Sequence, residues 1–297
     1  MFRFWTRFIH PIIATVGPRR ILEVGADSGF NTQHLLEYCA THDCIVDIVD
    51  PAPRPRLREV LAGFDREYQY YPLKSVHAIP QVEPPDIVLL DGDHNWTTVH
   101  AEFKLLYARA EGLGVAPPLV LMHDVAWPYA RRDMYYSPED IPEAERHPFA
   151  YCGVFPGMSE LTEEGMNAML ANAQHEGGPR NGVLTAVEDF IASASTPITL
   201  YRLPFFNGLG IVVPEARMTD ALRTLVEGFF SAGSLAETCA ELEEYFMKMN
   251  ASLQKTEASL TRRTEALGRA RAVMQEQARR IAELERALAE SPEPTAA

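Results

Sequence analysis

The sequence predicts an α/β protein with a mainly parallel sheet, helices on both faces of that sheet, and one long C-terminal helix. Short apolar runs alternate with segments whose apolar residues recur at helical spacing. This alternation is typical of strands joined by crossover helices, which cover both faces of a parallel sheet. The long helix is predicted because no proline interrupts the chain between Pro214 and Pro292.

The predicted elements follow one another in a regular order. Strands are expected at Ile21–Gly25, Cys44–Asp50, Gln69–Leu73, Asp86–Asp91 and Pro118–Asp124, with a hairpin at Ile198–Leu203 and Leu209–Val213. Helices are expected at Asn31–Ala40, Leu57–Phe64, Trp96–Ala110 and Val183–Ala192. Met1–Gly17 is expected to pack on the sheet as a short helix rather than serve as a signal peptide, because Arg7, His10 and Pro11 interrupt its apolar run. Ala126–Gly182 is expected to be a long loop.

Length and composition predict three segments. We expect an α/β domain over 1–215, a helical tail over 216–290 and a disordered end over 291–297. The net charge of -14 opposes general binding to nucleic acid, because phosphates would be repelled. The four cysteines form no C-x-x-C pair, so we expect reduced thiols in a cytoplasmic protein. No stretch reaches the roughly 18 uninterrupted apolar residues of a membrane span.

The tail carries a seven-residue repeat. Ser234–Glu237 fits a capping box that opens a helix. One stripe of the repeat is strongly apolar and consists of Phe246, Leu253, Leu260, Leu267, Met274, Ile281 and Leu288. The companion stripe is mixed and consists of Met249, Thr256, Arg263, Ala270, Gln277 and Leu284. This pattern predicts a coiled coil of modest stability, used for homo-oligomerisation or for binding a partner. The alternative is an amphipathic helix lying on its own domain.

The first predicted strand runs into a glycine turn, Glu23-Val24-Gly25-Ala26-Asp27-Ser28-Gly29, and a helix follows. Gly25 allows a ligand to approach the backbone closely. Asp50, at the end of the second strand, follows at about the ~20-residue interval expected of a carboxylate that binds a ribose. Many nucleotide-binding folds share this arrangement, and a tight turn without a ligand is the alternative. Glu23 and Asp27 would repel a diphosphate but suit a cofactor that carries an ammonium and a sulfonium.

That turn resembles the first motif of class I S-adenosylmethionine (SAM)-dependent methyltransferases, which have a Rossmann-like fold. Asp27 stands where the common form of the motif has glycine. The resemblance implies that SAM is the cofactor, that Glu23 and Gly25 lie near its methionine portion, and that Asp50 binds its ribose. The full set of cofactor-binding residues expected from the resemblance is Glu23, Gly25, Ala26, Ser28, Asp50 and Ser75.

Ionisable side chains gather at the ends of two predicted strands. The fourth strand ends in Asp91-Gly92-Asp93-His94, and the fifth ends in His123-Asp124. The carboxyl ends of neighbouring parallel strands meet at one edge of the sheet, so we expect these side chains to lie together. A loop or cap role is the alternative for any one of them. Methyl transfer to a hydroxyl requires alignment and removal of a proton, which a histidine near neutrality can perform.

The segment Asp-Gly-Asp-His-Asn-Trp, with His-Asp and Trp127-Pro128 after the fifth strand, resembles a subgroup of these enzymes. The subgroup contains macrolide-sugar O-methyltransferases and is related to cephalosporin-hydroxylase-like proteins. The resemblance implies that Asp91, His123 and Asp124 bind a metal, with Asp91 also part of the catalytic pair, and that His94 is the general base. Mg²⁺ and Mn²⁺ are the expected ions. His123 stands where related metal-dependent members carry an acidic residue, which leaves metal use open.

The resemblance therefore implies an O-methyltransferase that acts on a hydroxyl of a sugar, a glycan or a glycosylated small molecule. The aromatic and arginine-rich run Trp127–Tyr136 and the turn Gly177–Gly182 could cover the acceptor, or could simply tie a structural loop. Two other functions remain open. One is a hydroxylase-like relative that uses the same metal site, and the other is a non-catalytic SAM-binding scaffold that assembles through its coiled coil.

Overall fold

The computed structural model describes residues 1–65 and 67–289, and these residues fall into two compact units. The first unit spans Met1–Phe229, and the second begins at Phe230. The first unit therefore extends beyond residue 215, because helix α7 (Asp220–Gly228) buries Leu222 and Val226 in its core. The end expected to be disordered, 291–297, lies outside the described residues.

The first unit is built on a seven-stranded sheet in the order β3-β2-β1-β4-β5-β10-β9. These strands are β3 (Tyr68–Tyr71), β2 (Ile45–Val49), β1 (Arg20–Val24), β4 (Ile87–Leu90), β5 (Leu119–His123), β10 (Leu209–Pro214) and β9 (Ile198–Leu203). The first five are parallel, and β10 is antiparallel to both of its neighbours. The α/β prediction with a mainly parallel sheet and a long C-terminal helix is confirmed.

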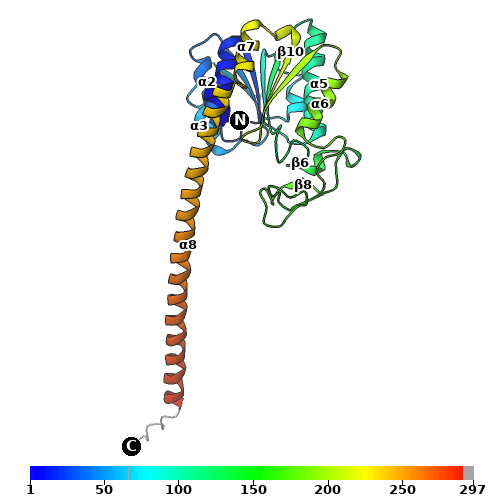
Figure 1. Ribbon diagram of the computed structural model, residues 1–297. Helices are drawn as coiled ribbons and strands as arrows, with labels where there is room; N and C mark the ends of the chain where they lie inside the picture. The colour runs from blue at the N-terminus through cyan, green and yellow to red at the C-terminus, as the bar shows by residue number, and fades with distance from the viewer. Residues whose placement is uncertain (66, 290–297) are drawn as a thin grey trace, which may run out of the picture. The chain divides into compact units, whose positions relative to one another are not determined.

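Helices cover both faces of the sheet (Figure 1). Alternate strand residues point to opposite faces, so Ile87 and Leu89 join one apolar cluster while Val88 and Leu90 join the other. The first cluster contains residues of α1 (His10–Val16), α2 (Phe30–Cys39), α3 (Pro55–Leu61) and α7. The second contains residues of α4 (Ser75–Ala78), α5 (Trp96–Leu113) and α6 (Val183–Ser193). The N-terminal segment contributes Phe4 and Phe8 to the first cluster through η1 (Phe2–Phe4) and the π-helix η2 (Trp5–Ile9).

The segment expected to be a long loop has structure of its own. It forms a small antiparallel sheet in the order β6-β8-β7, from β6 (Met134–Tyr135), β8 (Ala171–Ala173) and β7 (Phe149–Ala150) (Figure 1). Two 3-10 turns, η3 (Pro138–Asp140) and η4 (Glu143–Glu145), precede β7, and η5 (Glu215–Arg217) follows β10. Strands this short carry no clear period-2 pattern, which is why the sequence did not reveal them.

The second unit is a single helix, α8 (Ala232–Ala289), of 58 residues. It begins before the capping box expected at Ser234, because the hydroxyl of Ser231 accepts the Ser234 backbone N–H at 3.3 Å. The side chain of Leu288 lies outside the described side chains. Within the described residues, neither α8 nor any other helix is both long and apolar enough to cross a membrane.

Candidate active site

The candidate site lies where the strand order reverses. From β1 the chain proceeds to β2 on one side, whereas β4 is followed by β5 on the other side. In open α/β sheets the helices diverge at such a reversal, and a ligand site is expected in the crevice at the carboxyl ends of the strands. The glycine turn follows β1, and the aspartate–histidine group follows β4 and the neighbouring β5.

Gly25 brings the glycine turn against the end of β4. Its φ is +86°, and a Cβ built on it would lie 2.2 Å from the carbonyl oxygen of Asp91. Its N–H donates to the Val49 carbonyl at 2.9 Å, which also ties the turn to β2. Gly29, with φ +73°, caps α2 at its N-terminus. Any side chain at Gly25 would thus force β1 and β4 apart.

Asp50 and Asp27 both stabilise the glycine turn. Asp50 accepts hydrogen bonds from the backbone, and Asp27 accepts them from side chains. The Asp50 carboxylate is buried and accepts the backbone N–H groups of Asp27, at 2.7 Å, and Ala52, at 2.8 Å. Asp27 adopts a φ of +46°, and its carboxylate accepts from Arg54 Nε at 2.6 Å and from the Ser28 hydroxyl at 2.9 Å. An aspartate tolerates the left-handed backbone at this glycine position because its short side chain bonds locally.

Glu23 lies buried beneath the turn. Its carboxylate accepts from Asn31 Nδ2 at 2.8 Å and from the Thr32 hydroxyl at 2.6 Å. Burial raises the pKa of Glu23 to about 7, against the opposing effect of these two hydrogen bonds. The group can therefore hold a proton or a negative charge near neutrality, depending on what lies beside it.

The remaining predicted cofactor residues lie at the start of the helices beside the crevice. Ala26 is buried, and Ser28 is partly exposed at the turn. Ser75 is buried at the start of α4 and lies beside Glu102 of α5. Burial raises the pKa of Glu102 to about 8, although the hydrogen bond from Ser75 lowers it. Glu102 was not predicted from the sequence, because a single acid on an amphipathic helix normally faces solvent.

Asp91, His123 and Asp124 form a three-residue group whose donor atoms all lie within 4.8 Å of one another. His123 Nδ1 lies 3.2 Å from Asp91 Oδ1 and 2.8 Å from Asp124 Oδ2. The other oxygen of Asp91 lies 2.8 Å from the Met1 ammonium. Asp124 adopts a φ of +61°, which turns its carboxylate back toward the end of β5. The structure thus brings together the three residues expected to bind a metal.

A backbone contact fixes the orientation of His123. Its Nε2 lies 2.9 Å from the carbonyl oxygen of Phe206, which can only accept, so Nε2 carries a proton and Nδ1 faces the carboxylates. Burial acts to lower the pKa of His123, but the charges of Asp91 and Asp124 prevail and raise it to about 10. Burial likewise acts to raise the pKa of Asp91, but the charges of His123 and the Met1 ammonium, with hydrogen bonds from His123 and His94, together hold it well below its usual range.

His94 completes the group. Its Nε2 lies 3.2 Å from Asp124 Oδ2 and 3.9 Å from Asp91 Oδ1, but neither ring nitrogen makes a hydrogen bond within the described residues. Burial acts to lower the pKa of His94, but the Asp124 and Asp91 carboxylates together outweigh it, so the net shift is upward. The rings of Tyr129 and Tyr136 flank the imidazole at centroid distances of 5.5 and 5.7 Å. His94 therefore presents ring nitrogens that are near the carboxylates but uncommitted.

Asp93 does not join this group. Its carboxylate accepts the His94 backbone N–H at 3.1 Å and the Thr98 hydroxyl at 2.9 Å, at the start of α5. The sequence predicts that all five ionisable side chains of the two strand ends meet, but the structure brings together only four. Asp93 instead takes the loop-and-cap role.

Two buried charged residues of the Trp127–Tyr136 segment, Arg132 and Asp133, are structural. Asp133 is fully buried, and its carboxylate accepts the Trp96 and Gly182 backbone N–H groups, both at 2.7 Å, and the Tyr135 hydroxyl at 2.9 Å. Arg132 is also buried and donates to backbone carbonyls of the small sheet and its loop. The turn Gly177–Gly182 is held in the same way, since Asn181 accepts from the Asp133 N–H at 2.7 Å. These residues anchor a structural loop rather than face a ligand.

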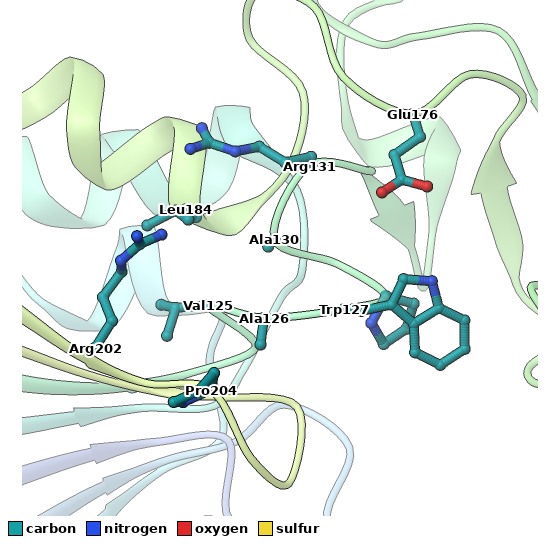
Figure 2. Close-up of a pocket in the computed structure, with 10 residues that line it drawn as sticks. Val125, Ala126, Trp127, Ala130, Arg131, Glu176, Leu184, Arg202 and Pro204 are labelled. Carbon is teal, nitrogen blue, oxygen red and sulfur yellow. The ribbon is translucent and has the colours of Figure 1, made fainter. Parts of the chain in front are cut away.

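A cavity of about 450 Å³ opens beside the chain that follows Asp124 (Figure 2). Trp127, Arg131 and Arg202 lie around it, together with Glu176 and apolar residues (Figure 2). Arg131 is paired with Glu188 at 2.6 Å. Arg202 has no ion-pair partner within the part of the chain that the structure describes. The cavity thus offers an aromatic face and an uncommitted guanidinium.

Comparisons with known proteins give structural similarity only. No protein-family model matches the chain, and no curated protein matches it. A methyltransferase of Podospora anserina, PaMTH1, with bound S-adenosylhomocysteine has 17% identity and a TM-score of 0.44 over 69% of this chain and 76% of its own. A Burkholderia thailandensis 1,6-didemethyltoxoflavin-N1-methyltransferase has 13% identity and a TM-score of 0.37 over 66% and 70%. Human N-acetylserotonin methyltransferase has 9% identity and a TM-score of 0.39 over 72% and 53%. Similarities this distant assign neither a family nor a function.

Proposed function

We propose that the chain is a SAM-dependent O-methyltransferase that transfers a methyl group to a hydroxyl of a sugar or glycosylated acceptor. The observation that carries the proposal is the position of Gly25. It holds an acidic glycine turn directly against Asp91, the first residue of the aspartate–histidine group. A cofactor in the crevice between β1 and β4 would thus lie beside groups that can deprotonate an acceptor.

The charges at the turn favour SAM over a dinucleotide. Asp27 and Glu23 place two carboxylates at or beneath the turn. The nearby Arg54 is paired with Asp27, and Arg56 donates to the Ser28 carbonyl, so both arginines are already engaged by the protein. A carboxylate near its pKa at neutral pH can accept a hydrogen bond from the ammonium of the methionine portion. Asp50 retains free lone pairs on both oxygens, because each accepts only one backbone N–H, and these could accept ribose hydroxyls.

The three residues Asp91, His123 and Asp124 have the donor types and orientation of a divalent metal site. The Phe206 carbonyl binds the Nε2 proton of His123, which is the usual way in which a protein fixes a metal-ligating imidazole. Nδ1 is left directed at the two carboxylates, where a cation can replace its proton. A mixed set of oxygens and one imidazole suits Mn²⁺ as well as Mg²⁺. A bound cation would lower the pKa of an acceptor hydroxyl and orient it.

We assign His94 as the general base. Its ring nitrogens are buried beside both carboxylates and make no hydrogen bond within the described residues, so one can accept a proton from the acceptor hydroxyl. The carboxylates alone favour the protonated imidazole, which could not act as a base. A positive charge at the metal site would offset them and return His94 to the neutral form. Base and metal site are therefore expected to work together.

The acceptor would lie along the chain that follows Asp124. The cavity of about 450 Å³ is within the size range of small-molecule sites. Trp127 offers a face on which a sugar ring can stack, and Arg202 can donate to hydroxyl or acidic groups. The four free cysteines also agree with the cytoplasmic location that we propose for this activity.

Calorimetric titration with SAM and with NAD tests the cofactor, and we expect binding of SAM alone. Incubation with SAM and a panel of glycosylated small molecules tests the reaction. Transfer of a methyl group adds about 14 Da to the product, whereas oxygen insertion by a hydroxylase-like enzyme adds about 16 Da. Binding of NAD alone, or oxygen insertion, would contradict the proposal. SAM binding without turnover on any acceptor would favour a scaffold.

A further inference from the structure

Most of the large apolar side chains of α8 lie on one side of the helix, and Met247, 58% exposed, is outside this stripe. We call the positions of Phe246 and Met249, and every seventh residue after each, the seam. Eight apolar seam residues are more than half exposed: Phe246 at 53%, Met249 at 54%, Leu253 at 57%, Leu260 at 64%, Leu267 at 63%, Met274 at 68%, Ile281 at 56% and Leu284 at 60%. A helix that exposes such a stripe is stabilised when a partner covers the stripe.

The opposite side of α8 is occupied by ion pairs within the helix. Glu244 pairs with Lys248, Glu265 with Arg269, and Glu276 with Arg279. In the heptad that places Phe246 at a and Met249 at d, all six of these residues are at c or f, the positions farthest from the seam. The solvent-facing side and the seam are thus separated along the length of the helix. This separation is typical of a coiled coil rather than of an isolated helix, whose charges would be spread around it.

The residues that flank the seam are balanced in charge. Between Phe246 and Ala287 the charged e and g positions are Glu257, Arg271, Arg280 and Glu285, two of each sign. A strongly acidic or basic partner would call for flanks of one opposite sign, whereas balanced flanks suit a second copy of the same helix.

The order of these flanking residues fits a parallel pairing. When two copies run parallel in register, each g residue faces the e residue five positions later on the other copy. Arg280 then faces Glu285, twice by symmetry, and no flank pair has like charges. Gln277 meets Gln277, and two amides can satisfy each other. Arg263 is the one seam residue that meets a like charge, and its aliphatic stem allows the guanidinium to reach solvent.

We propose that α8 pairs with a second copy of this chain as a parallel, in-register two-stranded coiled coil. The seam continues to Cys239, an exposed thiol at an a position, so the two Cys239 side chains would face each other. The proposal depends only on α8 and is independent of the methyltransferase proposal.

Light scattering of the full chain after gel filtration tests the pairing. We expect twice the 33.2-kDa mass of one chain. The variant Leu260→Glu/Leu267→Glu places two charges in the seam and should weaken the dimer by at least about 100-fold. Thr261→Glu/Gly268→Glu adds the same charge one residue further along, outside the seam, and should remain dimeric. A monomeric wild type, or equal behaviour of the two variants, would overturn the proposal.

Mild oxidation tests the orientation. In a Cys152→Ser background, which removes the other accessible thiol, we expect a disulfide between two Cys239 residues, identified by peptide mass spectrometry. Cys39 and Cys44 are buried and should not take part. The additional change Cys239→Ser should abolish the crosslink while leaving the dimer intact. A dimer that forms no Cys239 crosslink would overturn the parallel register.

Discussion

A Cβ on Gly25 would lie 2.2 Å from the carbonyl oxygen of Asp91, so the turn after β1 and the end of β4 are in direct backbone contact. This contact couples the two halves of the candidate site. The turn that would hold the cofactor and the residue that begins the aspartate–histidine group cannot move independently, because no side chain separates them.

Replacing Gly25 with alanine should therefore both destabilise the fold and abolish SAM binding. The change combines a strained φ of +86° with a steric clash, and we expect a loss of more than about 2 kcal/mol in unfolding free energy. Gly114→Ala is the matched control, because Gly114 has a φ of +66° with no atom within 4 Å of the added Cβ. Strain alone should cost about 1 kcal/mol there and leave SAM affinity unchanged. Urea unfolding measures the free energy of unfolding, and calorimetry measures the SAM affinity. Similar losses in the two variants would show that the steric clash at Gly25 has no effect.

Asp124→Asn should weaken metal binding. Asparagine tolerates the φ of +61° at this position, so the change removes the charge of one proposed ligand without straining the backbone. We expect the affinity for Mn²⁺, followed by electron paramagnetic resonance, to fall by at least about tenfold. Asp93→Asn is the control, since that carboxylate binds Thr98 and the His94 backbone and lies outside the group. Equal losses in the two variants would argue for nonspecific attraction to an acidic surface.

His94→Ala should abolish turnover while leaving SAM affinity nearly intact. The imidazole is placed to accept a proton and has no contact that holds the glycine turn, so kcat should fall by about 10²–10⁴. Steady-state kinetics and calorimetry on the same preparation separate the two effects. The surface variant His175→Ala serves as the control and should keep full activity. A fully active His94→Ala enzyme would remove this residue from the proposed mechanism.

The features that could be predicted from the sequence are those that depend on residues close together along the chain. Apolar runs marked β1, β2, β4 and β5 to within a residue or two, because buried parallel strands are almost uniformly apolar. The ends of β4 and β5 then placed Asp91 and Asp124 at one edge of the sheet. The motif gave His94 in the same way, since it follows Asp91 by three residues.

The sequence could not predict contacts made by the backbone across long separations. The carbonyl that orients His123 belongs to Phe206, 83 residues away, and a backbone oxygen leaves no side-chain signal. Asp93 and Asp133 look as functional as Asp91 by residue type, yet both carboxylates are used to hold loops and helix starts. Only the direction in which each side chain points separates these roles, and that direction is set by tertiary packing.

Glu102 should make the free energy of unfolding depend on pH. The dependence is expected between the ordinary pKa of a glutamate and the raised pKa of Glu102 in the fold. Burial raises its pKa from 4.5 to about 8, so the folded protein binds an extra proton between these values and loses stability as the pH rises through about 8. Asp93 adds to this rise, whereas Ser75 and His94 oppose it. Glu102→Gln keeps the shape and removes the charge. We expect the variant and wild type to match near pH 4.5, and the variant to be more stable by a few kcal/mol at pH 9. Urea unfolding at both pH values measures the difference in unfolding free energy between the variant and wild type. The other titrating groups are the same in both proteins, so their contributions cancel. A difference that does not change with pH would show that Glu102 titrates normally in the fold.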